Sequence, residues 1–206
     1  MKGEFSFQNP SAFEVVKLLD LKPGLKVWDA CAAPGGKTAL MAEMDSSLDI
    51  LASDSSASRI EKMQDLMNRL GLTNIKTEVI DLAPAQDSAT SSQHLSKFDR
   101  ILLDVPCSNM GVIARRPESV YRMTPESINE VAELQFKILE NASAALAPGG
   151  RLVYATCSPD PTETTRVIAR FVKAHPEFVK VGEPVLPGLK DSRLDGFFAQ
   201  ALEYKK

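Results

Sequence analysis

Phe98-Asp99-Arg100-Ile101-Leu102-Leu103-Asp104-Val105-Pro106-Cys107-Ser108 is the segment that says most about the fold. It begins with a nearly continuous apolar run, residues 98–105, and ends in a Pro-Cys-Ser triplet. A short apolar run bounded by turn residues is typical of a strand buried on both faces, as in a parallel sheet covered by helices. We therefore expect an α/β fold with this strand in its interior.

A second cysteine triplet, Thr156-Cys157-Ser158, follows another expected strand at residues 152–155. The chain between the two triplets is expected to form one long helix, which opens at Thr124-Pro125-Glu126, includes Leu146 and stops at Pro148-Gly149-Gly150. A strand–helix–strand unit brings both strand ends to the same edge of a parallel sheet. Both thiols are therefore expected to face one pocket.

The remaining chain alternates between strand-like and helix-like segments. Further strands are expected at residues 25–30, 50–54, 75–81, 178–181 and 194–202, the last with a bend at Gly196. Further helices are expected from Asn9-Pro10 with an apolar stripe of Phe13, Val16 and Leu19, after Gly36, over 55–70 with Gly71 as the cap, and over 163–174. Residues 84–97 are polar and are expected to form a surface loop. This order predicts a doubly wound, mostly parallel, seven-stranded sheet of the Rossmann type.

Length and composition indicate one domain, residues 1–206, with a core of its own. The chain is 44% hydrophobic and 25% charged, and it contains no apolar run long enough for a signal peptide or a membrane span. Its three cysteines are too few and too scattered for a disulfide framework. We therefore expect free thiols, a cytoplasmic location and no metal site.

The charge balance argues against a strongly basic nucleic-acid binder, because the formal net charge is −3. One compact basic cluster stands out, formed by Arg115, Arg116 and Arg122, with Arg100 nearby in sequence. Taken alone, this cluster fits a solvated loop as well as it fits a phosphate-binding surface.

The loop after the first expected strand, Cys31-Ala32-Ala33-Pro34-Gly35-Gly36-Lys37-Thr38, resembles the end of a phosphate-binding Walker loop. The spacing excludes that motif, because Cys31 stands where the first glycine is required. The small residues of the loop instead allow a ligand to approach the backbone at the end of a strand. A tight turn without a ligand is the alternative.

Two carboxylates follow the next strands, Asp54 after the second and Asp81 after the third. Nucleotide-binding sheets place a carboxylate at the end of the second strand to accept hydrogen bonds from ribose hydroxyls. Each residue alone could equally be a helix cap or a turn residue. Together with the loop they predict an adenosine-type pocket, and S-adenosylmethionine fits it better than ATP because no Mg²⁺-phosphate motif is present.

Several of these motifs together resemble the Sun/nucleolar-protein family of RNA cytosine-C5 methyltransferases, and the likeness is greatest to the bacterial 16S ribosomal RNA enzymes. They are Asp29 to Thr38, Asp104 to Ser108, Gly111-Val112-Ile113, Arg116-Pro117, Thr156-Cys157-Ser158 and Asp195-Gly196-Phe197-Phe198. The resemblance covers nearly the whole chain, and the paired cysteine motifs are its most specific part. It implies the fold of the class I S-adenosylmethionine-dependent methyltransferases.

The resemblance also implies a role for each matched residue. The cofactor S-adenosylmethionine would contact Cys31, Ala32, Ala33, Pro34, Gly35, Gly36, Lys37, Asp54, Arg59, Asp81 and Asp104. Cys157 is implied as the nucleophile that adds to C6 of cytosine, Cys107 as the thiol that assists product release, and Asp104 as a contact on the ring-nitrogen side. The partner would be RNA, in particular ribosomal RNA, with an unpaired or flipped cytosine. Arg115, Arg116 and Arg122 would then contact backbone phosphates.

Two departures from the family pattern keep other hypotheses open. Glu163-Thr164 stands where the family usually has Glu-Asn, and the family's N-terminal RNA-binding extension is not included in these residues, so RNA affinity could depend on a partner or a further domain. One alternative is a cofactor-binding scaffold for ribosome assembly. Another is a DNA cytosine-C5 methyltransferase, which would use the Pro106-Cys107 cysteine as its nucleophile and gives no role to the second triplet.

Overall fold

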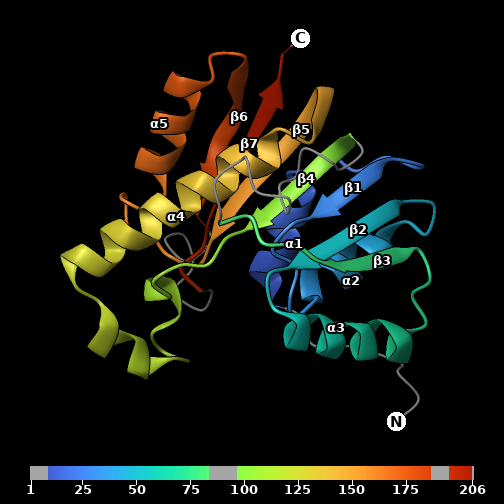
Figure 1. Cartoon of the computed structure of the whole chain (residues 1–206), viewed down its shortest axis with the longest axis horizontal. Helices are drawn as coiled ribbons and strands as arrows, with labels where there is room; N and C mark the ends of the chain where they lie inside the picture. Colours follow the sequence, from blue (N-terminus) through green and yellow to red (C-terminus); the bar gives the residue numbers. More distant parts are fainter. Residues whose placement is uncertain (1–8, 84–96, 187–194, 206) are drawn as a thin grey trace.

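The computed structural model describes residues 9–83, 97–186 and 195–205, and it confirms the predicted seven-stranded sheet. The strand order is β3-β2-β1-β4-β5-β7-β6. The strands are β1 (Lys26–Asp29), β2 (Asp49–Asp54), β3 (Ile75–Val79), β4 (Phe98–Asp104), β5 (Leu146–Thr156), β6 (Phe178–Val185) and β7 (Phe198–Tyr204). Strands β1 to β5 run parallel, and β7 is antiparallel to both of its neighbours (Figure 1).

Helices cover both faces of this sheet (Figure 1). They are α1 (Pro10–Lys17), α2 (Gly36–Met44), α3 (Ala57–Leu70), α4 (Pro125–Ser143) and α5 (Thr165–Ala174). Helices α4 and α5 pack on one face, and α1 and α2 pack on the other, with α3 beside α2. No helix in the described part of the chain has the length and apolar character needed to cross a bilayer.

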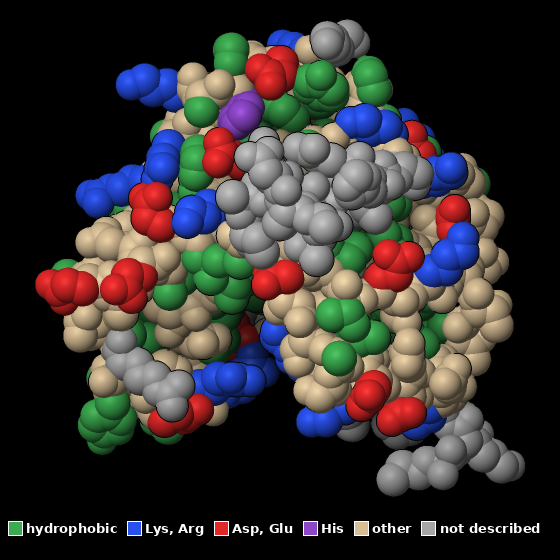
Figure 2. Space-filling model, viewed as in Figure 1, with side chains coloured by type: hydrophobic (Ala, Val, Ile, Leu, Met, Phe, Trp, Pro, Cys, Tyr) green, Lys and Arg blue, Asp and Glu red, His purple; other side chains and the backbone are tan. Residues whose placement is uncertain are grey.

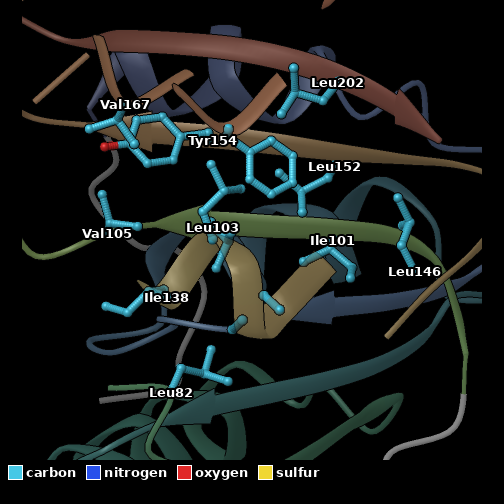
Figure 3. Packing of buried hydrophobic residues seen from close by; sticks show 14 of the residues in the cluster. Leu82, Ile101, Leu103, Val105, Ile138, Leu146, Leu152, Tyr154, Val167 and Leu202 are labelled. Atoms are coloured by element: carbon cyan, nitrogen blue, oxygen red, sulfur yellow. The ribbon is translucent and has the colours of Figure 1, made fainter. Parts of the chain in front are cut away.

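The apolar run of β4 shows why the strand must be central. Ile101 and Leu103 belong to the cluster under α4 and α5, which Figure 3 shows from close by, whereas Leu102 belongs to the cluster under α1 and α2. All three side chains are fully buried. Because successive side chains of a strand point to opposite faces, only a strand covered on both sides buries such a run.

The order of the strands reverses between β1 and β4, which are neighbours although β2 and β3 separate them in sequence. In open α/β sheets, ligands bind beyond the carboxyl ends of the strands at such a reversal. The loop after β1 and the Pro106-Cys107-Ser108 triplet after β4 therefore lie at the place where this fold forms binding sites.

The segment between the two cysteine triplets differs from the expected single helix. Two short 3₁₀ segments, η2 (Met110–Val112) and η3 (Pro117–Arg122), precede α4. The helix also ends earlier than predicted, at Ser143, because Leu146 already pairs with Phe98 as the first residue of β5. Pro148-Gly149-Gly150 thus lies in an irregular part of β5, where the register with β4 shifts, and does not act as a helix stop.

Smaller differences concern the ends of the chain. Strand β7 begins at Phe198, so Gly196 lies before the strand and does not bend it. Leu194 and residues 84–96 of the predicted loop fall outside the described residues. Phe13 was expected in the apolar stripe of α1, but it is 41% exposed, and Val15 takes the buried position beside Val16.

Candidate active site at the carboxyl ends of the strands

A cavity of about 680 Å³ opens at the carboxyl ends of the central strands. Its walls come from the segments that follow β1, β2, β3, β4 and β5, together with the segment before β7. A smaller recess of about 180 Å³ adjoins it beside the loop after β1. Figure 2 shows the molecule hollowed between the part that carries η2 and η3 and the part that carries α3, with Lys and Arg side chains along this hollow.

Backbone hydrogen bonds, within the loop and to β2, hold the loop after β1 in a tight conformation. Ala32 N–H donates to the carbonyl of Ser53 at 2.8 Å, and Gly35 N–H donates to the carbonyl of Ala32 at 2.8 Å. Gly35 has a φ of +101°, and a Cβ there would lie 2.8 Å from the side chains of both Met63 and Met67. A glycine is therefore required at this position, because the backbone is left-handed and α3 lies directly against it.

Asp29, the last residue of β1, places a carboxyl group beneath this loop. Its side chain is 1% exposed, and its Oδ2 accepts a hydrogen bond of 2.6 Å from the Thr38 hydroxyl. Its Oδ1 has no hydrogen-bond partner among the described residues. Burial raises the pKa of Asp29 to about 7, although Thr38 and the charge of Lys37 oppose this shift. The residue lines the smaller recess, so an unpaired buried acceptor faces this end of the site.

Two further carboxylates lie at or just beyond the ends of β2 and β3. Asp54, at the end of β2, is 4% exposed, accepts from the Ser56 backbone at 2.9 Å and pairs with Arg59 at 2.8 Å. Asp81 lies two residues beyond the end of β3, which stops at Val79 and not at Asp81 as predicted. Both carboxylates line the cavity.

Lys37 and Asp104 form an ion pair at the centre of the cavity. Lys37 Nζ lies 2.5 Å from Asp104 Oδ2, and the two side chains are 16% and 28% exposed. The Lys37 ammonium also lies 5.1 Å from the centre of the Phe197 ring. The pair thus joins the loop after β1 to the end of β4 and to the segment before β7.

Cys107 and Cys157 meet as the strand–helix–strand argument predicts. Their Cα atoms are 6.4 Å apart, and the structure pairs the two sulfurs as a disulfide, whereas the sequence predicts free thiols. This separation lies within the range that a disulfide spans. The side-chain oxygen of Asn109 lies 3.2 Å from Cys157 Sγ and 4.0 Å from Cys107 Sγ. Both cysteines line the cavity, so two strand ends present sulfur at one point.

Cys31 is distinct from this pair. It is the one free cysteine, and burial, reinforced by the charge of Asp29, raises the pKa of its thiol. A thiol with a raised pKa is a poor nucleophile at neutral pH. Cys31 therefore forms part of the wall of the cavity, as its position in the loop predicts.

Glu163 links the two cysteine loops from behind the cavity. It is fully buried, and its carboxylate accepts from Ser108 N–H at 2.9 Å, from the Ser108 hydroxyl at 2.5 Å and from Gln135 Nε2 at 2.9 Å. Gln135 also donates to the Pro106 carbonyl at 2.9 Å. The Ser108 hydroxyl lies 3.3 Å from the hydroxyl of Ser158, in the second triplet. These contacts fix the position of each cysteine loop relative to the other.

The segments next to the ends of the described chain close the remaining sides. Asn9 and Arg115 both contact the carboxylate of Asp195, and all three residues line the cavity. Gly111 N–H donates to the Cys157 carbonyl at 2.9 Å, and its own carbonyl accepts from Gly196 at 2.8 Å. A Cβ on Gly111 would lie 1.7 Å from the Gly196 oxygen, so these backbones can approach only because both residues are glycines.

Most of the predicted site residues are brought together. The cavity is lined by Cys31, Ala33, Pro34, Lys37, Asp54, Arg59, Asp81, Asp104, Cys107, Arg115, Arg116 and Cys157. Ala32 and Gly36 line the smaller recess, and Gly35 packs against Met63 and Met67 of α3. The side chain of Arg122 lies outside what the structure describes. Arg100 is not part of the basic cluster, because its guanidinium donates to the Leu19 carbonyl at 2.6 Å, next to α1.

Sequence reasoning missed several residues of the site. They are Asn9, Asp29 as a ligand-facing carboxyl, Asn109, Asp195 and Phe197. Asp29 carried a signal as an acidic residue at a strand end, and Asp195 and Phe197 belong to a motif that resembles the family's but was given no role. Thr164, which replaces the family's usual Asn, is 2% exposed and donates to the Asp160 carbonyl at 2.8 Å, so it closes a local turn before α5.

Comparison with known proteins finds relatives that are named as ribosomal RNA methyltransferases, and a solved structure of similar fold. The probable ribosomal RNA small subunit methyltransferase B of Bacillus subtilis (strain 168) is 37% identical over 220 residues, which cover 98% of this chain and 48% of that protein. Ribosomal RNA small subunit methyltransferase B of Yersinia pseudotuberculosis serotype O:1b (strain IP 31758) is 38% identical over 95% of this chain and 46% of that protein. NSun6 from Pyrococcus horikoshii, solved with SFG, superposes with a TM-score of 0.83 and 29% identity over 100% of this chain and 54% of that chain.

The chain thus spans about half the length of the curated relatives it matches. A family model described as 16S rRNA methyltransferase RsmB/F matches residues 16–199, which include both cysteine triplets and the loop after β1. Because this model matches most of the chain, and because the chain is 37% identical to the Bacillus subtilis relative, it belongs to the RsmB/F family of 16S rRNA methyltransferases.

Proposed function

We propose that this chain transfers a methyl group to C5 of a cytosine in ribosomal RNA through a covalent bond between Cys157 and C6. The observation that carries the proposal is the meeting of two cysteines, from separate strand ends, at a cavity that also contains a cofactor-type loop. A single nucleophile would need only one thiol. A second thiol suits a reaction in which the enzyme must also be released from its substrate.

S-adenosylmethionine is the methyl donor of this family, and the cavity fits it. Its ammonium group would match the buried Asp29 carboxyl, whose Oδ1 lacks a partner among the described residues. Its ribose would match Asp54, and its adenine would lie near Asp81. The loop from Cys31 to Lys37 would supply the wall between these contacts. When bound, the cofactor supplies an electrophilic methyl group on its sulfonium sulfur.

Cys157 performs the first chemical step on the base. Its thiolate adds to C6 of the cytosine, a new S–C6 bond forms, and the electron pair of the C5–C6 double bond moves to C5. C5 thereby becomes nucleophilic enough to accept a methyl group. Cys107 and Cys157 must both be reduced for this step. The attacking species is a thiolate, and a cysteine in a disulfide cannot form one.

Cys107 and Asp104 act on the same base. After methylation, the Cys107 thiolate accepts the proton from C5, the C–H electron pair re-forms the C5–C6 double bond, and the Cys157 thiolate leaves. Cys107 lies beside Cys157 and assists this release. Asp104, held by Lys37, faces the same cavity and contacts the ring-nitrogen side of the cytosine. The target base must leave any duplex to reach this point.

The experiment that tests the proposal is methylation of 16S rRNA by the purified chain, with isotope-labelled S-adenosylmethionine and a thiol reductant. The rRNA is then digested to nucleosides and analysed by mass spectrometry. We expect label in 5-methylcytidine and none with Cys157→Ala. Label in another nucleoside, transfer to DNA in preference to RNA, or retained transfer by Cys157→Ala would contradict the proposal.

A further inference from the structure

We propose that η3, together with the recess between it and α4, binds the nucleotide adjacent to the target cytosine, with the base of that nucleotide stacked on Tyr121. This inference rests on the proposed function, because it takes single-stranded RNA as the substrate. It assigns a second nucleotide site, distinct from the cavity that holds the cofactor and the target base.

The recess has a volume of about 300 Å³ and lies against the cysteine loop that follows β4. Its floor is the Cys107-Ser108-Asn109 segment, one wall is η3, and the other wall is the start of α4. It shares Cys107, Asn109 and Arg116 with the larger cavity. A chain that enters the larger cavity with one base can therefore continue into this recess with the next.

The lining of the recess suits a nucleobase. Met123 and Val131 provide apolar surface for the face of a ring. Glu118, Ser119 and Ser127 place polar side chains around this surface, which base edges could meet. Arg116 lies where the two cavities join, which is the position expected of the phosphate between the two nucleotides.

Tyr121 is the most exposed of the large hydrophobic side chains in the described chain, with 91% of its surface accessible. Its neighbour Val120 is 50% exposed. In a 3₁₀ helix, residues three apart lie above one another, so Tyr121 lies on the same side of η3 as Glu118, which lines the recess. An aromatic ring on this side of η3 can stack on a base that enters the recess.

The segment that contains Tyr121 lies at the surface, and hydrogen bonds connect the residues before it to the active site. Within residues 114–121, only Ser119 is buried, and its hydroxyl donates to the Arg116 carbonyl at 2.8 Å. The preceding segment, η2, is fixed to the Cys157 carbonyl through Gly111. Figure 1 shows η3 projecting away from the sheet beyond the start of α4. Folding energy does not explain an exposed aromatic here, because Tyr121 buries almost no surface.

Single exposed apolar residues are common on protein surfaces and need no function. Tyr121 differs from such residues in its position. Its segment also contains Arg116 and borders a recess of the size of a base, which Cys107 lines as well. The test must therefore separate stacking on RNA from mere exposure.

The first measurement is the dissociation constant for fluorescein-labelled, single-stranded oligocytidylate RNA, by fluorescence anisotropy under reducing conditions. We expect Tyr121→Ala to weaken binding roughly tenfold, and Tyr121→Trp to restore it, because stacking depends on the ring and not on the hydroxyl. Val131→Phe adds a ring to the wall of the recess and should also weaken binding. Met44→Ala is the control, since Met44 is 47% exposed at the end of α2 and lies outside both cavities.

The second measurement is a double-mutant cycle on the RNA that the chain methylates, in which each nucleotide beside the target is made abasic in turn. One abasic position should weaken binding to the wild-type protein and have no further effect on Tyr121→Ala. Equal binding by wild type and Tyr121→Ala, or equal abasic effects in both, would overturn the inference. The anisotropy measurement requires no methyl transfer, so a failure of the proposed chemistry would be seen separately in the methylation assay.

Discussion

Asp29 shows at the scale of one residue how the fold prepares the cofactor end of the site. A carboxyl group at the end of β1 is enclosed, bonded on one oxygen by Thr38 and left without a partner on the other among the described residues. Burial disfavours its charged form and raises its pKa to about 7. The unfolded chain would ionise the same group near its ordinary value of 3.8. The folded state therefore holds this proton more tightly than the unfolded state does.

The first prediction concerns stability against pH in the cofactor-free protein. The contribution of Asp29 is fully present below its unfolded pKa and is lost as pH rises towards about 7, because over this range the unfolded chain ionises the carboxyl group while burial keeps it protonated in the folded protein. Urea titrations should show a fall in the free energy of unfolding of about 2–3 kcal/mol between about pH 5 and about pH 8 from this group alone. Asp29→Asn should flatten that fall.

The control for this prediction is Asp65→Asn, on the exposed side of α3. It should leave the wild-type pH profile in place. A profile that is equally steep in wild type and Asp29→Asn would show that Asp29 is not the group responsible. A bound ammonium group should act in the opposite direction, because it favours the ionised carboxylate.

Glu163 acts at the scale of whole elements. Lying just before α5, it receives hydrogen bonds from Gln135 in α4 and from both donors of Ser108 after β4. The hydroxyl of Tyr154, in β5, donates to the Glu163 carbonyl at 2.7 Å. The side chain and backbone of this one buried residue thus join two helices and two strands behind the cysteines. Removing an acceptor from such a network leaves buried donors unsatisfied, which is the costly case.

The second prediction is that Glu163→Gln impairs methyl transfer more than cofactor binding. The amide nitrogen of glutamine is a donor and cannot accept from Ser108 or Gln135, so the Cys107 loop should shift. We expect kcat to fall by ten- to a hundredfold and the free energy of unfolding to fall by about 1–3 kcal/mol. Calorimetry should give an unchanged cofactor affinity.

Glu130→Gln, at an exposed position of the same helix that carries Gln135, is the matched control and should retain wild-type kcat. If Glu163→Gln lowered stability and cofactor affinity together while kcat held, Glu163 would be a general structural residue with no positioning role.

The elements of the sheet could be predicted from the sequence because their apolar patterns are local and strong. The run 98–105 is one such pattern, and it defined a strand buried on both faces. The η2 and η3 segments could not be predicted, because the position of η2 comes from backbone contacts of Gly111 with Cys157 and Gly196, which lie far away in sequence, and among the described residues η3 is held only by short-range turns. The predicted end of α4 was wrong for a related reason. Leu146 fits a helical pattern, but its pairing with Phe98 makes it part of β5.

The candidate site could be predicted to the extent that strand ends meet at one edge of a parallel sheet. Cys107, Cys157, Asp54 and the loop after β1 follow from that rule. Asn9 and Asn109 do not, because nothing in their local sequence shows that they face a cavity, and the motif that contains Asp195 does not show what its carboxylate contacts. The positions of Asn9 and Asp195 depend on how segments far apart in sequence meet, and the position of Asn109 depends on the loop after β4.

At the scale of the whole molecule, the sheet, the two helical layers and the closing segments bring a cofactor end and a thiol end into one cavity. The family match covers the same residues, and the chain spans about half the length of the relatives it matches. The central claim is that this half contains the reactive nucleophile, and that the nucleophile is Cys157 and not Cys107.

Covalent trapping tests that claim most directly. The reduced protein is incubated with S-adenosylmethionine and rRNA that contains 5-fluorocytidine, which lacks the C5 proton needed for release, and protein–RNA adducts are separated on a denaturing gel. We expect an adduct with wild type, none with Cys157→Ala, and with Cys107→Ala an adduct that also accumulates on unmodified rRNA. An adduct that persists in Cys157→Ala, or a wild-type protein that forms none, would contradict the assignment of Cys157 as the nucleophile.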